Sequence, residues 1–207
     1  MLKIEFCGDI HGKFNDFFQK VHKSDADLVI QLGDFGLFNE KDLKKVSKHS
    51  HKNWKFIRGN HDNPELCESL PNHLKSGYHK DLNLFVINGA FSIDREWRTE
   101  GIDFWSNEEH SINELETLIT EYEFIKPDFI VSHDCPEGIV PEFFPEYRTI
   151  FKTRTGQALK SMLDIHQPKS WVFGHHHRTR IKQIRNTLFH CLGELETATY
   201  DISQKVN

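Results

Sequence analysis

Short apolar or alternating stretches recur along the chain, and a glycine or a group of polar residues follows each of them. Their length and their content of valine, isoleucine and phenylalanine are typical of β-strands. The pattern predicts strands at Leu2–Cys7, Leu28–Leu32, Trp54–Ile57, Leu84–Ile87, Phe129–Ser132 and Trp171–Phe173.

Helical patterns lie between several of these strands. Phe14–Val21 has apolar residues at helical spacing, and Glu40–Lys48 is charged and amphipathic. Ser111 and Glu114 form a capping-box pattern at the start of a third stretch, and residues 155–168 give a fourth that stops before a proline. Strands that alternate with helices predict an α/β fold, with helices packed on the faces of the sheets.

Two further segments alternate without a helix between their halves. In residues 84–97, Asn88 and Gly89 separate two strand-like pieces and predict a hairpin, and Ile181–Cys191 alternates in the same way. These segments favour mixed sheets, stacked as a sandwich flanked by helices, over one parallel sheet. The length of 207 residues predicts a single domain over residues 1–207.

Charge and cysteine content narrow the function classes. The net charge of −5 gives no general attraction for a polyanion, so nucleic acid is expected only as a substrate. Four widely spaced cysteines without a C-x-x-C pair argue against a zinc knuckle and for reduced thiols. The N-terminus turns polar too early for a signal peptide, and no window approaches the roughly 18 apolar residues of a membrane span. We therefore expect a soluble cytoplasmic protein without a membrane partner, whose oligomeric state the sequence leaves open.

Metal-capable residues follow five of the predicted strands. They lie in the stretches "GDIHG", "GDFG", "RGNHD", "SHDCP" and "GHHH". Loops at the carboxyl ends of strands in α/β sheets gather on one edge, where ligand sites normally lie. One such stretch is weak evidence, because a lone buried histidine is more often a hydrogen-bonded core residue. Five of them, in a chain with 14 histidines, predict a metal site.

The spacing within these stretches also suits a metal. Side chains two residues apart in an extended segment point the same way, so Asp9 and His11 can face one ion together. By the same rule, His175 and His177 face the site. His176 then points away, to solvent or a neighbouring loop.

The order Asp-x-His, Gly-Asp, Gly-Asn-His-Asp, His, Gly-His-x-His over Gly8–His177 resembles the signature of calcineurin-like metallophosphoesterases. The forms "SHDCP", "GAFSIDREWRT" and "IHQPKSWVFGHHH" look most like the small phage and bacterial metallophosphatases of that family, some of which resemble protein phosphatases. The resemblance implies a four-layer α/β/β/α fold, a dinuclear metal centre and hydrolase activity.

The resemblance also implies which residues bind the two divalent ions. Asp34 would bridge both ions. Three ligands would complete each site, namely Asp9, His11 and His177 in the first and Asn60, His133 and His175 in the second. Nitrogen and oxygen ligands without a thiolate suit Mn, Fe, Co, Ni or Zn, and manganese is our first expectation.

In the mechanism that the resemblance implies, a hydroxide bridging two ions roughly 3.5 to 4 Å apart attacks phosphorus. His61 would donate a proton to the leaving oxygen, and Arg58 would clamp phosphate oxygens. The alternatives are that His61 only orients ligands and that Arg58 forms a surface salt bridge.

The second block departs from the family pattern. Protein phosphatases continue it as Gly-Asp-x-x-Asp-Arg-Gly, whereas this chain reads "GDFGLFN", with Leu37 and Phe38 in place of the acid and the arginine. Asp62 or Asp134 is therefore the candidate to orient His61. The departure favours hydrolysis of a small or unspecialised phosphoester over dedicated protein phosphatase activity.

Arginines beside aromatic residues are candidate substrate contacts. They are Arg95 and Arg98, which flank Trp97, and Arg148, which follows Tyr147. The alternative for the first two is pairing with nearby glutamates. The predicted function is hydrolysis of phosphomonoesters, with phosphodiesters as a second class of small substrate. A nuclease or cyclic-nucleotide phosphodiesterase, and a non-catalytic metal-binding scaffold, are the competing hypotheses.

Overall fold

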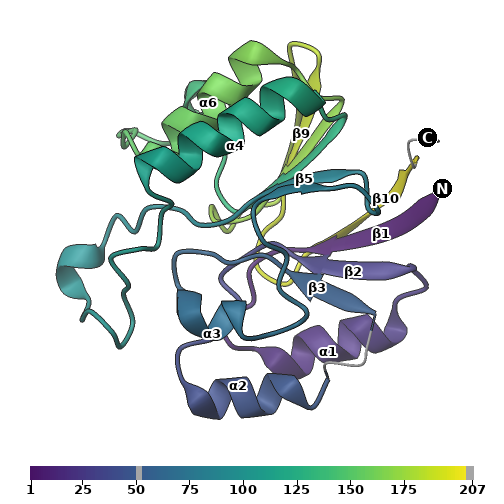
Figure 1. Cartoon of the computed structure of the whole chain (residues 1–207), viewed down its shortest axis with the longest axis vertical. Helices are drawn as coiled ribbons and strands as arrows, with labels where there is room; N and C mark the ends of the chain where they lie inside the picture. Colours follow the sequence, from purple (N-terminus) through teal and green to yellow (C-terminus); the bar gives the residue numbers. More distant parts are fainter. Residues whose placement is uncertain (50–52, 204–207) are drawn as a thin grey trace.

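The computed structural model describes residues 1–49 and 53–203, whose strands form two sheets (Figure 1). The strands of the smaller sheet are β1 (Leu2–Cys7), β2 (Leu28–Gln31), β3 (Trp54–Phe56) and β10 (Thr197–Ile202). Their order is β10-β1-β2-β3, in which β1, β2 and β3 are parallel and β10 is antiparallel to β1.

The larger sheet has the order β4-β5-β6-β7-β9-β8. Its strands are β4 (Gly77–His79), β5 (Leu84–Ile87), β6 (Phe129–Ser132), β7 (Ser170–Phe173), β8 (Arg180–Ile184) and β9 (Thr187–Cys191). The inner strands are parallel, and the edge strands β4 and β8 are antiparallel to their neighbours. The predicted mixed sheets are therefore confirmed.

Helices cover the outer face of each sheet. They are α1 (Phe14–Lys23), α2 (Glu40–Ser47), α3 (Pro64–Glu68), α4 (Ile112–Ile125), α5 (Val140–Phe143) and α6 (Arg154–Ile165), with short 3₁₀ helices η1 (Arg95–Trp97) and η2 (Glu137–Ile139). In Figure 1, α1 and α2 lie below the smaller sheet, and α4 and α6 lie above the larger one. The four-layer α/β/β/α arrangement is the predicted one.

Three apolar clusters hold the layers together. Ile4, Phe6 and Ile30 pack between the two sheets, whereas Cys7 and Val29, on the same strands, pack toward the helices. Because these strands are buried on both faces, they appear in the sequence as nearly continuous apolar runs. A third cluster joins the larger sheet to α4, α5 and α6.

The hairpin predicted at Asn88 and Gly89 is wrong. After β5 the chain does not turn back as a strand, and η1 follows instead. The Asn88 side chain donates to the Leu74 carbonyl, and the Gly89 amide donates to the Arg58 carbonyl. These tertiary contacts hold the turn open, so β5 pairs with the earlier β4.

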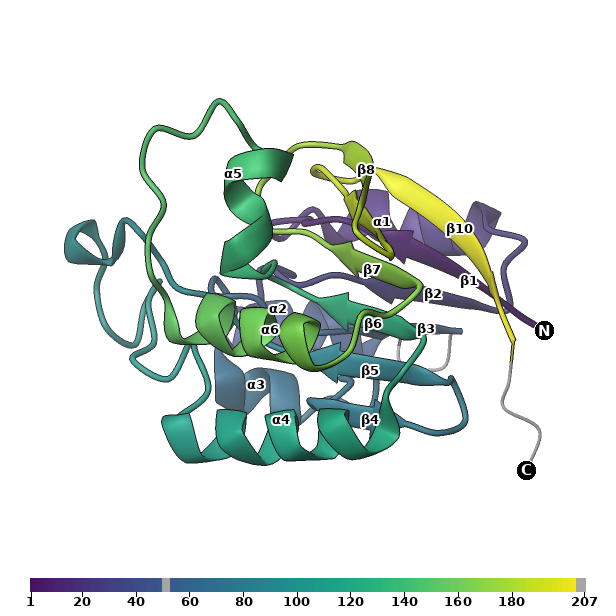
Figure 2. The same ribbon diagram turned by 90° about the horizontal axis from the view of Figure 1, so that it is seen from above.

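Residues 91–105 extend from the body of the molecule as a long excursion that contains η1 (Figure 1, Figure 2). No helix within residues 1–49 and 53–203 is long and apolar enough to cross a membrane.

Candidate metal centre

The carboxyl ends of parallel strands from both sheets bring the seven predicted ligands to one place. Asp9 and His11 follow β1, Asp34 follows β2, Asn60 follows β3, His133 follows β6, and His175 and His177 follow β7. The smaller sheet therefore supplies the carboxylates, the amide and one imidazole, and the larger sheet supplies three imidazoles.

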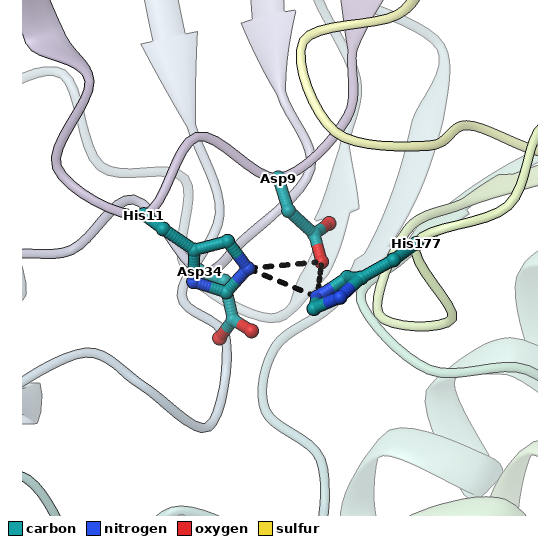
Figure 3. A group of neighbouring side chains, drawn as sticks. All are labelled: Asp9, His11, Asp34 and His177. Atoms are coloured by element: carbon teal, nitrogen blue, oxygen red, sulfur yellow. Dashed lines mark hydrogen bonds and ion pairs between the residues drawn. The ribbon is translucent and has the colours of Figure 1, made fainter.

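Asp9, His11, Asp34 and His177 form the first group, with ligand atoms within 4.8 Å of one another. Figure 3 shows the Asp9 carboxylate and the two imidazole rings facing one another. Nε2 of His11 lies 2.9 Å from Nε2 of His177, which in turn lies 3.1 Å from Oδ2 of Asp9.

Asp9 provides a direct test of whether a cation fits here. Its Oδ1 accepts a hydrogen bond from the His175 amide at 3.0 Å, but its buried Oδ2 has no hydrogen-bond partner among the described residues. A buried carboxylate oxygen without a donor is costly, and two imidazole nitrogens converge on the same point. The donor set fits a divalent cation with nitrogen and oxygen ligands.

Asp34, His133 and His175 form the second group, also within 4.8 Å. Nε2 of His133 lies 3.3 Å from Oδ1 of Asp34 and 3.1 Å from Oδ1 of Asn60. Nδ1 of His133 donates to the Leu32 carbonyl at 2.7 Å, so Nε2 is the nitrogen that faces Asp34 and Asn60. Burial would lower the pKa of His133, but Asp34 raises it to about 10, so a cation bound here would take the place of the proton on Nε2. Asp34 belongs to both groups, as a bridging ligand must.

Electrostatics in the site favour a positive ion. Burial alone would raise the pKa of Asp34, but His133 and the neighbouring imidazoles outweigh it and hold this pKa well below its ordinary value. Burial lowers the pKa of His175 to about 4, so its imidazole is neutral at physiological pH and can coordinate a metal.

Tight turns, and not extended segments, direct several of the predicted ligands toward the site. Extended segments were expected, but four ligands have left-handed backbone conformations, namely His11 (φ 44°), Asp34 (φ 52°), His175 (φ 64°) and His177 (φ 51°). Residues other than glycine adopt this conformation rarely, at a cost of about 1 to 3 kcal/mol each. Tight turns, in which the amides of Ile10 and His11 donate to the Asp34 carbonyl, therefore aim these side chains.

His61 lies beside both groups. Its amide donates to Oδ1 of Asp34 at 2.8 Å, and its ring centroid is 5.4 Å from that of His11. Arg98 reaches in from the excursion and places Nη1 2.6 Å from Nδ1 of His61, while its Nη2 donates to Asp94 at 2.7 Å. Burial lowers the pKa of His61; Asp34 opposes this and the Arg98 charge adds to it.

A cleft of about 700 Å³ opens above these residues. Its floor includes Asp34, Asn60, His61, His175 and His177. Arg98 and Arg148 also line the cleft, together with the apolar residues Phe91, Ile93, Ile150 and Phe151. The cleft thus combines a metal-capable floor with cationic and apolar walls.

A family model described as "Calcineurin-like phosphoesterase" matches residues 2–179. The chain belongs to this family. It is therefore a phosphoesterase, a hydrolase with candidate metal-binding groups of histidine and aspartate. This match shows the family as a whole, and the predicted likeness to its small phage metallophosphatases stays a prediction.

Several solved structures are similar to this chain at low sequence identity. The phosphopantetheinyl hydrolase PptH of Mycobacterium tuberculosis is 11% identical, with a TM-score of 0.53 over 93% of this chain and 90% of that one. The phosphoesterase YfcE of E. coli is 15% identical, with a TM-score of 0.45 over 94% and 80%. A predicted phosphoesterase of Streptococcus pneumoniae is 12% identical, with a TM-score of 0.43 over 97% and 83%. A search of curated protein sequences finds no match.

Asp62 does not orient His61. Its fully buried carboxylate accepts hydrogen bonds from four backbone amides, those of Phe35, Gly36, Leu37 and Gly59. It therefore fixes the loop that carries Asp34. Asp134, the other candidate, contacts His176 at 3.4 Å, and His176 packs against Phe144 and away from the ligand groups.

Arg58 does not line the cleft, contrary to its predicted role as a phosphate clamp. It is buried, and its Nη1 donates to the Glu108 carbonyl at 2.7 Å. Arg95 is turned away as well, because its guanidinium lies over the Phe91 ring, 4.3 Å from the centroid. Of the predicted substrate contacts, Arg98 and Arg148 line the cleft.

Two residues that the sequence did not single out support a proposed ligand, Ser92 directly and Glu108 through Ser92. Nδ2 of Asn60 donates to Oγ of Ser92 at 2.9 Å, and that hydroxyl donates to Oε2 of Glu108 at 2.6 Å. Ser92 follows β5, so the rule that functional residues follow parallel strands could have found it. Glu108 has no such signal, because it lies in the segment between the excursion and α4 and follows no strand.

Proposed function

We propose that this chain hydrolyses phosphomonoesters in the 700 Å³ cleft, with phosphodiesters as a second substrate class, at a centre of two divalent cations. The observation that carries the proposal is that Asp34 belongs to two converging donor groups at the floor of a cleft lined by arginine. The proposal keeps manganese as the first expected metal. We also propose that residues 1–207 form a single domain, that the protein is related to the small phage metallophosphatases, and that it acts in the cytoplasm.

The chain's own residues hold the cations and position the ester. Asp9, His11 and His177 would hold one ion, Asn60, His133 and His175 the other, with Asp34 between them. When bound, two such cations supply a hydroxide nucleophile at neutral pH and neutralise phosphoryl charge.

His61 is proposed as the proton donor to the leaving oxygen, because its ring lies at the ligand groups and lines the cleft. Burial lowers the pKa of His61 in the metal-free protein. A phosphate dianion beside the ring favours the imidazolium, since an opposite charge stabilises the charged form.

Arg98 is proposed to bind the phosphate, together with Arg148, which also lines the cleft. In the stretch "GDFGLFN", Phe38 takes the place of an arginine of protein phosphatases. The Phe38 ring stacks on that of Trp105 from the excursion, with 6.0 Å between the ring centroids. Arg98, from that excursion, supplies the missing guanidinium. Its planar fork suits phosphate oxygens.

The test compares p-nitrophenyl phosphate with bis-p-nitrophenyl phosphate, using protein stripped by a chelator and supplied with Mn, Ni, Co, Zn or Mg. Metal should restore hydrolysis, the monoester should be the faster substrate, and Asp34→Asn should remain inactive. Asp16→Asn, at an exposed position on α1, is the matched control and should behave as wild type. Metal binding without turnover of either ester would favour the scaffold hypothesis.

A further inference from the structure

The amide of Asn60 can bind a cation in only one of its two orientations. The carbonyl oxygen offers lone pairs, whereas the NH₂ group is only a donor. Oδ1 of Asn60 faces His133, 3.1 Å from Nε2, and Nδ2 faces Ser92. The side chain is almost completely buried, so contacts within the protein must select this orientation.

Ser92 and Glu108 supply the selection. The Glu108 carboxylate accepts from the Ser92 amide at 2.8 Å and from its hydroxyl at 2.6 Å. A serine hydroxyl has one proton, so once it is donated to Glu108 the Ser92 oxygen can only accept. The flipped Asn60 amide would place two acceptors against each other in a buried site, which is costly.

Arg58 holds Glu108 in place. Its buried guanidinium donates to the Glu108 carbonyl at 2.7 Å. On the other side, a Cβ added at Gly89 would lie 2.2 Å from the same carbonyl oxygen, so the two backbones are in close contact there. These contacts hold the Glu108 backbone in place, and with it the position of the carboxylate that accepts from Ser92.

We propose that Ser92 and Glu108 are positioning residues that hold Asn60 with its oxygen turned toward the ion bound by His133 and His175. The inference rests on the proposed function, because it takes Asn60 as a ligand. It adds two residues outside the proposed ligand set that would affect the affinity for one of the two ions by orienting Asn60.

Two variants test the device by different routes. Ser92→Ala removes the hydroxyl that accepts from Asn60. Glu108→Gln keeps the side-chain volume but reverses the direction of the hydrogen bonds, because the glutamine NH₂ can donate to the Ser92 oxygen. The Ser92 hydroxyl is then free to donate to Asn60, which favours the flipped orientation of the Asn60 amide. The matched control is Glu109→Gln, a neighbouring buried glutamate that accepts from the Thr155 amide.

The measurement is calorimetric titration of the chelator-stripped protein with Mn²⁺, after thermal melts show that each variant is folded. Wild type should bind two ions. Both variants should lose affinity at one site, by about 10- to 100-fold, and leave the other unchanged. Glu109→Gln should bind both ions as wild type does.

The background Asn60→Asp separates positioning from a general structural effect. A carboxylate presents oxygen in either orientation, so Ser92→Ala in this background should leave Mn²⁺ affinity unchanged or raise it. An equal loss in both backgrounds, or unchanged binding in the single Ser92→Ala and Glu108→Gln variants, overturns the inference. If wild type binds no second ion, or Asn60→Ala removes none, the proposed metal centre itself fails.

Discussion

Asp62 shows how a single buried charge can support a site without touching its reacting groups. Four backbone amides point at its carboxylate, and three of them belong to the loop that follows Asp34. Asp62→Asn should lower the free energy of unfolding by about 2 to 3 kcal/mol, because the amide NH₂ would face donors that lose their acceptor. Urea unfolding of the metal-free protein measures this, and Asp94→Asn, at an exposed position, should change it little.

At this scale the sequence predicted the seven side chains that gather but not the residues that support them. One strand end with aspartate, asparagine or histidine is weak evidence, but five such strand ends in one chain allowed their convergence to be inferred. The direction of Arg58 could not, because it depends on the Glu108 carbonyl, which lies fifty residues later in the chain. The roles of Asp62 and Ser92 depend on tertiary contacts of the same kind.

At the scale of elements, apolar runs predicted six strands to within a residue or two, because burial on both faces leaves a strong pattern. The turns were harder to predict. Left-handed His11 and His175 carry no sequence signal, since such residues adopt this conformation only where surrounding contacts impose it. Asn88 and Gly89 gave the pattern of a hairpin, but long-range hydrogen bonds override it.

The excursion over residues 91–105 supplies Arg98 to the cleft. Arg98→Ala should weaken inhibition by inorganic phosphate at least about tenfold, because a charge-assisted hydrogen bond contributes about 1.5 to 3 kcal/mol. Arg95→Ala is the matched control, since this arginine lies over Phe91 on the same excursion and should leave inhibition unchanged. The measurement is the inhibition constant of phosphate against p-nitrophenyl phosphate. Equal effects of the two substitutions would mean that Arg98 has no direct role.

At the scale of the whole molecule, the proposed centre links the two sheets. Asp9 and Asp34 come from the smaller sheet, and His133, His175 and His177 come from the larger one. Metal that binds only the folded chain should therefore stabilise it, by about 2.7 kcal/mol at a concentration one hundred times the Kd. Thermal melts with Mn²⁺ and with chelator test this, and Asp34→Asn should reduce the difference between them. A wild-type melting temperature independent of metal would argue against binding at this junction.

Two buried histidines away from the centre should make the metal-free protein sensitive to acid. Burial lowers the pKa of His73 and of His110 to about 4 each. Ser76 accepts from the Asn88 amide and its side-chain NH₂, so its hydroxyl proton is donated to Nε2 of His110, which must stay unprotonated. Nδ1 of His73 is buried and has no hydrogen-bond partner among the described residues.

Each of these histidines has a lower pKa in the folded protein, about 4, than in the unfolded chain, about 6.5. Between about pH 6.5 and pH 4 the unfolded chain binds protons at these histidines and the folded chain does not, so the free energy of unfolding falls as the pH is lowered. Each histidine contributes a slope of up to about 1.4 kcal/mol per pH unit. Urea unfolding at several pH values, with chelator present, should show a flatter dependence in His110→Gln than in wild type. His22→Gln, at an exposed position on α1, should keep the wild-type slope, and an unchanged slope in His110→Gln would exclude this histidine as a source of acid sensitivity.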